Sequence, residues 1–239
     1  MAEKPAGIPT QPQTSPNPHP PPLAPNYRAI SPDKRGSSLG KEGDQVGGST
    51  FASVLAEQFP ELKNVGGNDW GAVHRLDVET SGLVVFARNQ KTYELLREQF
   101  SKNRVEKEYT ALVEGVLQKP GKITWPIGPD PKSSKRVKVY RNHKEAVRGK
   151  AQEAVTVYKS VGQTQGFAPT TLLKITIKTG RRHQIRAHLA AMGHPIVGDR
   201  IYGGNHGGLP LHLHATRLKF KHPVEDRWVE VFSKPPFFF

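Results

Sequence analysis

The sequence contains no cysteine among its 239 residues. This absence excludes disulfide bonds, thiolate metal sites and a cysteine nucleophile, and it fits a protein of a reducing compartment. No run of about 18 apolar residues is present, so we expect no transmembrane helix. Residues 1–25 also lack the apolar core of a secretory signal. These absences predict an intracellular protein without a membrane partner, and they leave cytoplasm, nucleus and mitochondrion open as compartments.

Acidic residues are scarce. The chain has 21 Asp and Glu residues against 35 Lys and Arg residues, which gives a formal net charge of +14. A fold does not need such an excess, whereas a protein that binds a polyanion uses it to neutralise phosphate groups. The charge balance therefore favours a polyanionic partner.

Proline sets the N-terminal region apart from the rest of the chain. Residues 1–49 are rich in proline and poor in apolar residues, which predicts a largely disordered segment. Residues 50–233 carry the apolar patterns of one folded domain, and residues 234–239 form a tail. Lys4–Pro9 could still belong to the domain, but the apolar strand expected in front of Lys4 is missing.

Apolar spacing within the domain predicts many strands and few helices. Helices are expected near residues 51–59, 90–101 and 181–192. Strands are expected near residues 83–88, 105–114, 135–140, 152–159, 170–178, 211–219 and 227–232. This order predicts an α+β fold, with a mixed, mostly antiparallel sheet and flanking helices.

One aspartate stands out among the acidic residues. Asp77 lies in the stretch HRLDVETSGL, residues 74–83, beside Arg75 and just before an apolar strand. A carboxylate in a loop at the mouth of a sheet is well placed for chemistry. By spacing alone, an ordinary turn with a surface Asp–Arg pair is the simpler explanation.

A second stretch, TGRRHQIRAHLAAMGHPIVGD at residues 179–199, combines an apolar helix face with basic residues. Ile185 and Leu189 recur at the spacing that turns one face of a helix toward a core. Arg182 and Arg186 lie four residues apart and share another face. For these arginines, too, the simpler explanation from the pattern alone is a solvated basic face.

Both stretches resemble the signatures of RluA-type pseudouridine synthases, whose motifs read HRLDxxTSGL and GRxHQIRxHLxxxGHPIxGD. KEYTALVEG at residues 107–115 and HLHA at residues 212–215 are similar to two further family motifs, and Lys4–Pro9 is similar to the first, KPxG. The resemblance implies the pseudouridine synthase catalytic fold. It also implies isomerisation of specific uridines in structured RNA, either rRNA or tRNA. Nothing is consumed in that reaction, so no cofactor is implied.

The resemblance further implies roles for individual residues. Asp77 is expected to be the catalytic carboxylate, Arg186 to pair with it and keep it ionised, and Tyr109 to stack on the uracil and assist proton transfer. Whether Asp77 attacks the sugar or acts as a base is left open. Arg75 is a candidate to fill the gap left by a flipped base. The residues expected to contact substrate or RNA are Arg75, Arg182, His183, Gln184 and Leu213.

A basic run occupies residues 131–150. The β-like stretch Arg136–Tyr140, followed by Asn142 and Gly149, predicts a hairpin whose strands carry cations. In the family that the chain resembles, a hairpin here closes on the RNA. The RNA contacts expected from this run are Lys132, Lys135, Arg136 and Lys138. The alternative is an edge strand that its lysines protect from aggregation.

Ten histidines raise the question of a metal site. No acidic or cysteine ligand accompanies them at a known spacing, so we expect no metal. Two other functions compete with catalysis. A non-catalytic RNA-binding protein could retain the synthase fold, as a missing first strand would suggest, and a basic ribosome-associated protein would explain the charge alone. We expect the chain to be a monomer.

Overall fold

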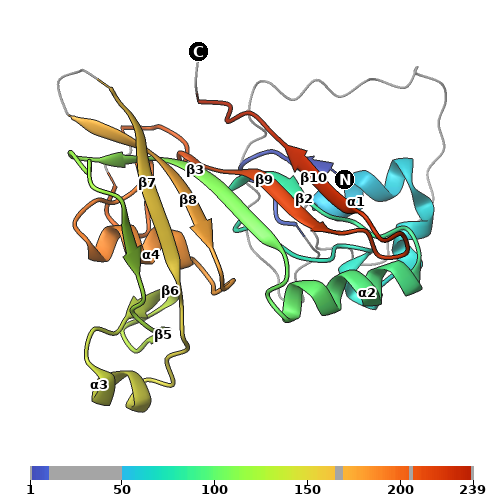
Figure 1. Ribbon diagram of the computed structural model, residues 1–239, viewed down its shortest axis with the longest axis horizontal. Helices are drawn as coiled ribbons and strands as arrows, with labels where there is room; N and C mark the ends of the chain where they lie inside the picture. The colour runs from blue at the N-terminus through green and yellow to red at the C-terminus, as the bar shows by residue number, and fades with distance from the viewer. Residues whose placement is uncertain (1, 11–49, 165–168, 205–206, 238–239) are drawn as a thin grey trace, which may run out of the picture.

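Strands dominate the computed structural model, which describes residues 2–10, 50–164, 169–204 and 207–237 (Figure 1). The strands of the main sheet are β1 (Ala2–Lys4), β2 (Ser81–Val84), β3 (Glu106–Glu114), β4 (Gly121–Ile123), β7 (Thr156–Thr164), β8 (Thr170–Ile177), β9 (Leu213–Lys221) and β10 (Trp228–Phe232). A separate hairpin consists of β5 (Ile127–Asp130) and β6 (Ser133–Val139). The helices are α1 (Phe51–Gln58), α2 (Gln90–Ser101), α3 (His143–Arg148) and α4 (Gln184–Ala191), with short 3-10 turns at Pro60–Asn64 and Gly67–Asp69.

The main sheet has eight strands in the order β1-β2-β9-β3-β8-β7-β4, with β10 added beside β9. Within the described residues, β2 and β9 run parallel and the other neighbouring strands run antiparallel. The α+β fold with a mixed, mostly antiparallel sheet is thereby confirmed. In the same part of the chain, no helix has the length and apolar character needed to cross a bilayer.

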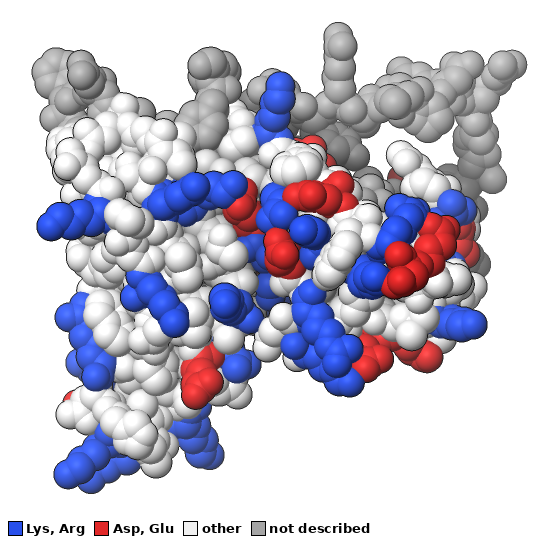
Figure 2. All heavy atoms as spheres, in the orientation of Figure 1, with Lys and Arg blue, Asp and Glu red and all other residues white. Residues whose placement is uncertain are grey.

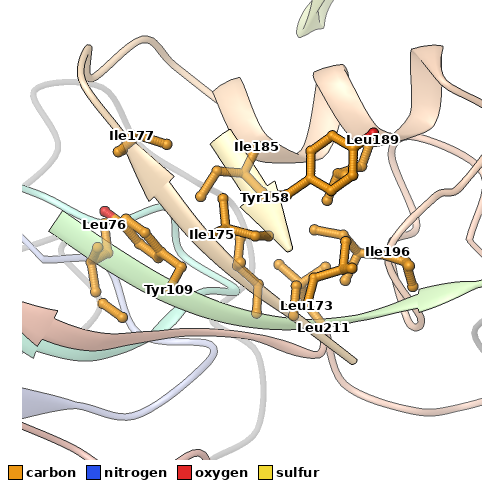
Figure 3. Close-up of a cluster of buried hydrophobic side chains, with 14 of the residues drawn as sticks. Leu76, Tyr109, Tyr158, Leu173, Ile175, Ile177, Ile185, Leu189, Ile196 and Leu211 are labelled. Atoms are coloured by element: carbon orange, nitrogen blue, oxygen red, sulfur yellow. The ribbon is translucent and has the colours of Figure 1, made fainter. Parts of the chain in front are cut away.

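Alternation along β3 decides which face of the sheet becomes the core. Tyr109 and Ala111 are buried, whereas Glu108, between Lys107 and Tyr109, lies half-buried on the other face. Helix α4 packs Ile185 and Leu189 onto the buried face (Figure 3). The core thus sits between α4 and the middle of the sheet, which fixes where the start of α4 lies.

The first strand is present, contrary to the expectation that it is missing. β1 pairs antiparallel with β2, with Lys4 opposite Gly82. The loop that follows is also tied in, because Gly7 donates its N–H to the carbonyl of Val78. The strand has three residues, too few for an apolar period to show in the sequence. The sheet therefore includes residues that the sequence places in the proline-rich segment; residues 11–49 lie outside the described part of the chain.

Two predicted elements begin at least three residues later than expected, for local reasons. β7 starts at Thr156 rather than at Gln152, because Gln152 forms a bridge with Ile127 of the hairpin instead. Helix α4 starts at Gln184, because His183 has a left-handed backbone with φ of 50°. A residue in that conformation cannot continue a right-handed helix.

The basic run contributes a strand to a hairpin. β6 pairs with the preceding segment, β5. Residues 143–148 form helix α3, whose first turn is capped by the side chain of Asn142. Figure 1 shows the hairpin and α3 extending together away from the main sheet.

The parallel pairing of β2 with β9 requires a glycine at position 82, and this requirement predicts the effect of a substitution there on folding stability. Gly82 has φ of +113°, and a Cβ there would lie 2.4 Å from the backbone oxygen of Ala215. We expect Gly82→Ala to lower the free energy of unfolding by about 2 kcal/mol or more, because the clash is with backbone. The measurement is urea denaturation. Gly162→Ala is the control, since a Cβ there meets nothing closer than 3.9 Å; an equal loss in both variants would contradict the explanation.

Candidate active site

Asp77 lies in the loop that leads into β2. Lys4, in the N-terminal segment, holds this loop in place. The Lys4 ammonium donates to the carbonyls of Pro5, Ile8 and Val78, the last at 3.0 Å. Lys4 is fully buried, and burial lowers its pKa to about 7, although the charge of Asp77 acts in the opposite direction. The Asp77 side chain is 25% exposed, so its carboxylate is accessible from one side.

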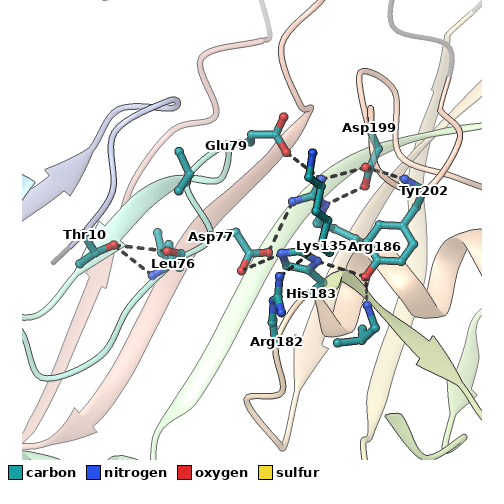
Figure 4. A network of polar contacts seen from close by, with 12 residues as sticks. Thr10, Leu76, Asp77, Glu79, Lys135, Arg182, His183, Arg186, Asp199 and Tyr202 are labelled. Atoms are coloured by element: carbon teal, nitrogen blue, oxygen red, sulfur yellow. Dashed lines mark hydrogen bonds and ion pairs between the residues drawn. The ribbon is translucent and has the colours of Figure 1, made fainter. Parts of the chain in front are cut away.

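The guanidinium of Arg186 is the centre of the polar network around Asp77 (Figure 4). Its side chain is only 2% exposed, and its Nη1 lies 3.7 Å from Oδ2 of Asp77. The shorter bonds go elsewhere: Nε and Nη2 donate to the two carboxylate oxygens of Asp199, each at 2.8 Å. Nη2 also donates to Glu79 at 2.7 Å. Three carboxylates therefore converge on one cation.

These carboxylates stabilise the charged form of the arginine. Burial opposes that charge, yet the surrounding carboxylates, Asp199 first, raise the pKa of the Arg186 guanidinium. Burial alone would raise the pKa of Asp199, but the hydrogen bonds and charge of Arg186 bring it below its usual value. The N–H groups of Ile201 and Tyr202 also donate to Asp199 Oδ1. The pair is thus fully ionised at neutral pH.

His183 and Tyr202 connect this network to the basic hairpin. His183 Nε2 lies 3.9 Å from Asp77, and its Nδ1 lies 3.1 Å from the hydroxyl of Tyr202. Burial lowers the pKa of His183 despite the charge of Asp77, so the ring is neutral at pH 7. The Tyr202 hydroxyl accepts the N–H of Val137 in β6. Arg182 adds a second link, because its guanidinium donates to the carbonyls of Ser134 and Lys135.

Tyr109 and Leu213 belong to the apolar core. Both are buried in one cluster with Leu76, the residue before Asp77, and Figure 3 shows Leu76 and Tyr109 of this cluster. Burial, and then the charge of Asp77, raise the pKa of the Tyr109 phenol. The phenol therefore stays protonated at neutral pH and offers an aromatic face and an O–H donor rather than a base.

The remaining predicted contacts are distributed over three places. Gln184 is buried, and its amide bonds to Thr156, Val155, Thr179 and the Arg181 N–H, so it joins two loops inside the protein. Arg75 is exposed beside Asp77. The exposed cations of the hairpin are Lys132, Lys135, Arg136 and Lys138. Figure 2 shows basic side chains gathered at the end of the projection that the hairpin and α3 form.

Sequence reasoning did not assign roles to Glu79, Asp199 and Tyr202. Glu79 lies in the stretch of residues 74–83 and Asp199 in that of residues 179–199. Their positions in these two motifs were the sequence signal that could have pointed to a role. Their function depends on contacts with Arg186 from loops 107 and 13 residues away, and periodicity carries no information about such pairs. Within the described ranges, no three His, Asp or Glu side chains converge as metal ligands.

Comparison with known proteins agrees with this geometry. Residues 1–191 match the family model described as RNA pseudouridylate synthase. The chain is 36% identical over 192 residues to an uncharacterized RNA pseudouridine synthase of Aquifex aeolicus, covering 75% of this chain and 58% of the relative. It is 38% identical over 169 residues to the dual-specificity RNA pseudouridine synthase RluA of Pasteurella multocida, covering 69% of this chain and 73% of the relative.

A solved structure resembles most of this fold. Human RNA pseudouridylate synthase domain containing 1 superposes with a TM-score of 0.65 at 27% identity, covering 79% of this chain and 75% of that one. The chain belongs to the RNA pseudouridylate synthase family and is of the RluA type. It spans somewhat more than half the length of several curated relatives that it matches, 58% and 56% of two of them.

The buried Arg186–Asp199 pair generates a pH-dependent prediction. Asp199→Asn leaves the guanidinium without its main counter-charge, so we expect the free energy of unfolding at pH 7 to fall by about 3 kcal/mol or more. The folded pKa of Asp199 lies below the unfolded value of about 3.9. Its contribution is therefore complete above about pH 4 and is lost as the pH falls through the folded pKa.

Urea denaturation of both proteins between neutral and acidic pH checks this prediction. The difference in stability should shrink below about pH 4. The matched control is Asp226→Asn. The Asp226 side chain is 94% exposed, and within the described residues its one ion pair is with Lys221 at the surface. A difference for Asp199→Asn that is independent of pH would contradict the assigned ion pair.

Proposed function

We propose that the protein is an RNA pseudouridine synthase that isomerises specific uridines in structured RNA, in rRNA or tRNA. The observation that carries the proposal is the accessible carboxylate of Asp77, which lies beside a buried, fully charged Arg186 and above the apolar cluster of Tyr109. In the reaction the N1–C1′ bond breaks, the uracil turns, and a C5–C1′ bond forms. C5 loses its proton and N1 ends protonated, so the reaction needs no redox cofactor.

The geometry supports a division of roles. Arg186 is held by Asp199 and Glu79, so it can offer charge to Asp77 without moving. A pre-organised cation of this kind stabilises the carboxylate throughout the reaction. We assign Tyr109 and Leu213, which are buried in one apolar cluster, to contact with the uracil, and the exposed Arg75 to the gap that a flipped base leaves. Asp77 acts on the sugar or on a proton, and both routes need the same ionised carboxylate.

The competing function, a non-catalytic RNA-binding protein, loses one of its two supports, while the other, the long proline-rich segment, lies mostly outside the described residues. That reading drew on a missing first strand, and β1 is present with Lys4 closing the loop of Asp77. A binding protein that keeps the fold would need Arg186 and Asp199 for stability, but it would have no need of Asp77 beside them. The matched relatives are named as synthases, which agrees with catalysis.

The first test of the proposal removes the charge of Asp77. We expect Asp77→Asn to abolish pseudouridine formation, with RNA affinity nearly unchanged because phosphate contacts dominate binding. The fold should persist, since Arg186 keeps Asp199 and Glu79. The measurement is pseudouridine mapping of total RNA from cells that carry the wild-type or the variant gene. Asp226→Asn is the charge-matched control, and residual activity of Asp77→Asn above a few per cent would refute the role.

A second test addresses the basic hairpin. Lys132, Lys135 and Lys138 are exposed on one projection, so reversing all three to glutamate should weaken RNA binding and flatten its dependence on salt. The expected reduction in the slope of log K against log salt is about 0.7–0.9 for each lost phosphate contact. Affinity is measured by fluorescence anisotropy over a salt series. Reversal of the exposed Lys63, Lys91 and Lys102 serves as the control, and equal slopes for the hairpin variant and wild type would exclude the hairpin as an RNA contact.

A further inference from the structure

Lys107 is a buried lysine on the active-site face of the sheet. It is 7% exposed and precedes Tyr109 by two residues in β3, so both side chains lie on the same face. At about 3.4 Å of rise per residue, their Cα atoms are roughly 7 Å apart. A nucleotide whose base lies against Tyr109 therefore brings its own backbone within reach of Lys107.

The carboxylates next to Lys107 in the strand belong to the opposite face. Glu106 pairs there with Arg217 at 3.1 Å, and Glu108 pairs with Lys174 at 2.7 Å. Among the described residues, Lys107 takes part in no ion pair and no carboxylate influences its pKa. Burying an ammonium group costs several kcal/mol unless an anion compensates for it.

The groups around Lys107 are positive or neutral. Burial, and then the charge of Arg181, lower the pKa of Lys107. Its Nζ lies 3.4 Å from the position that a Cβ would take on Gly180, beside Arg181. On the other side, burial and the charge of Lys107 lower the pKa of His74 to about 3, so that ring is uncharged. Lys107 thus lies between the stretch that contains Asp77 and the one that contains Arg186.

We propose that Lys107 and Arg181 bind one backbone phosphate of the RNA, adjacent to the uridine held against Tyr109. Lys107 and Arg181 are neighbouring cations, neither of which forms an ion pair with a carboxylate among the described residues, and Lys107 lies two positions from Tyr109 in β3. Such a pair matches a phosphodiester, which supplies the missing negative charge. The inference rests on the proposed function, because it takes the base beside Tyr109 to be the flipped uridine. The structural alternative is a lysine whose apolar stem packs in the core while its ammonium reaches solvent.

Lys107→Met separates these two explanations, because it keeps the stem and removes the charge. The probe is a fluorescent single-stranded oligouridylate, bound to the full chain in the Asp77→Asn background so that no turnover occurs. Loss of one phosphate contact should reduce the slope of log K against log salt by about 0.7. Affinity at low salt should fall roughly tenfold. Lys107→Arg should retain the slope.

The matched control is Lys174→Met, which removes a lysine from the opposite face of the same sheet. It should leave the slope unchanged. Combining Lys107→Met with Arg181→Met should reduce the slope by no more than one contact, because both cations bind the same phosphate. An unchanged slope for Lys107→Met, or an equal loss for Lys174→Met, overturns the phosphate site.

This experiment is independent of the test of catalysis. Pseudouridine mapping with wild-type protein decides whether the chain is a synthase, and salt slopes decide whether Lys107 binds a phosphate. A protein that forms no pseudouridine yet loses slope on Lys107→Met would refute the proposed function and leave the phosphate site standing. A synthase with the full slope in Lys107→Met would do the reverse.

Discussion

A single buried guanidinium, that of Arg186, fixes the relative positions of three chain segments. A charge so deeply buried must be paired, and Asp199 provides a bidentate partner while Glu79 takes a third bond. The helix α4, the loop before β2 and the loop after Ile196 are therefore tied to one another. These partners already satisfy the arginine, and Asp77 lies farther from it, with its Oδ2 3.7 Å from Nη1. The contacts that stabilise the fold thus leave the carboxylate of Asp77, the proposed catalytic group, 25% exposed.

Local sequence patterns predicted many of the strands and helices, because side-chain periods and helix caps are set by neighbouring residues. The extents of α2 and β3 follow from side-chain periods and from caps such as Asn89, which are properties of adjacent residues. Partners distant in the sequence are not encoded in that way. Three features depend on contacts between segments that the fold brings together. They are the pairing of Arg186 with Asp199, the pairing of β5 with β6, and the burial of Gln184. Likewise β1 has three residues and gains its place only by pairing with β2.

Side chains alternate between the two faces of strand β3, and the two faces therefore carry different charges. Its outward residues Glu106 and Glu108 are neutralised by basic partners on neighbouring strands, so that face is balanced at the surface. Its inward residues are Lys107 and Tyr109, which face the site without an acid of their own. A shift of one residue in register would exchange these faces and turn the glutamates toward the buried face of the sheet. The antiparallel pairing of β3 with β8 and β9 therefore sets the charge of the site as well as the core.

This arrangement of charges gives a reason for the chain's excess of basic residues. Asp77, Glu79 and Asp199 share one guanidinium, so the inner network carries net negative charge, which would repel the RNA that we propose as substrate. Such repulsion must be offset by cations at the rim, where they are solvated and free to meet phosphates. Arg182 contributes by position rather than by charge alone, because its donors hold the carbonyls of Ser134 and Lys135 in the hairpin. The acidic network and the basic hairpin are thus joined by one connected set of contacts, so a change that loosens the hairpin should affect the proposed binding of RNA before it affects the carboxylates.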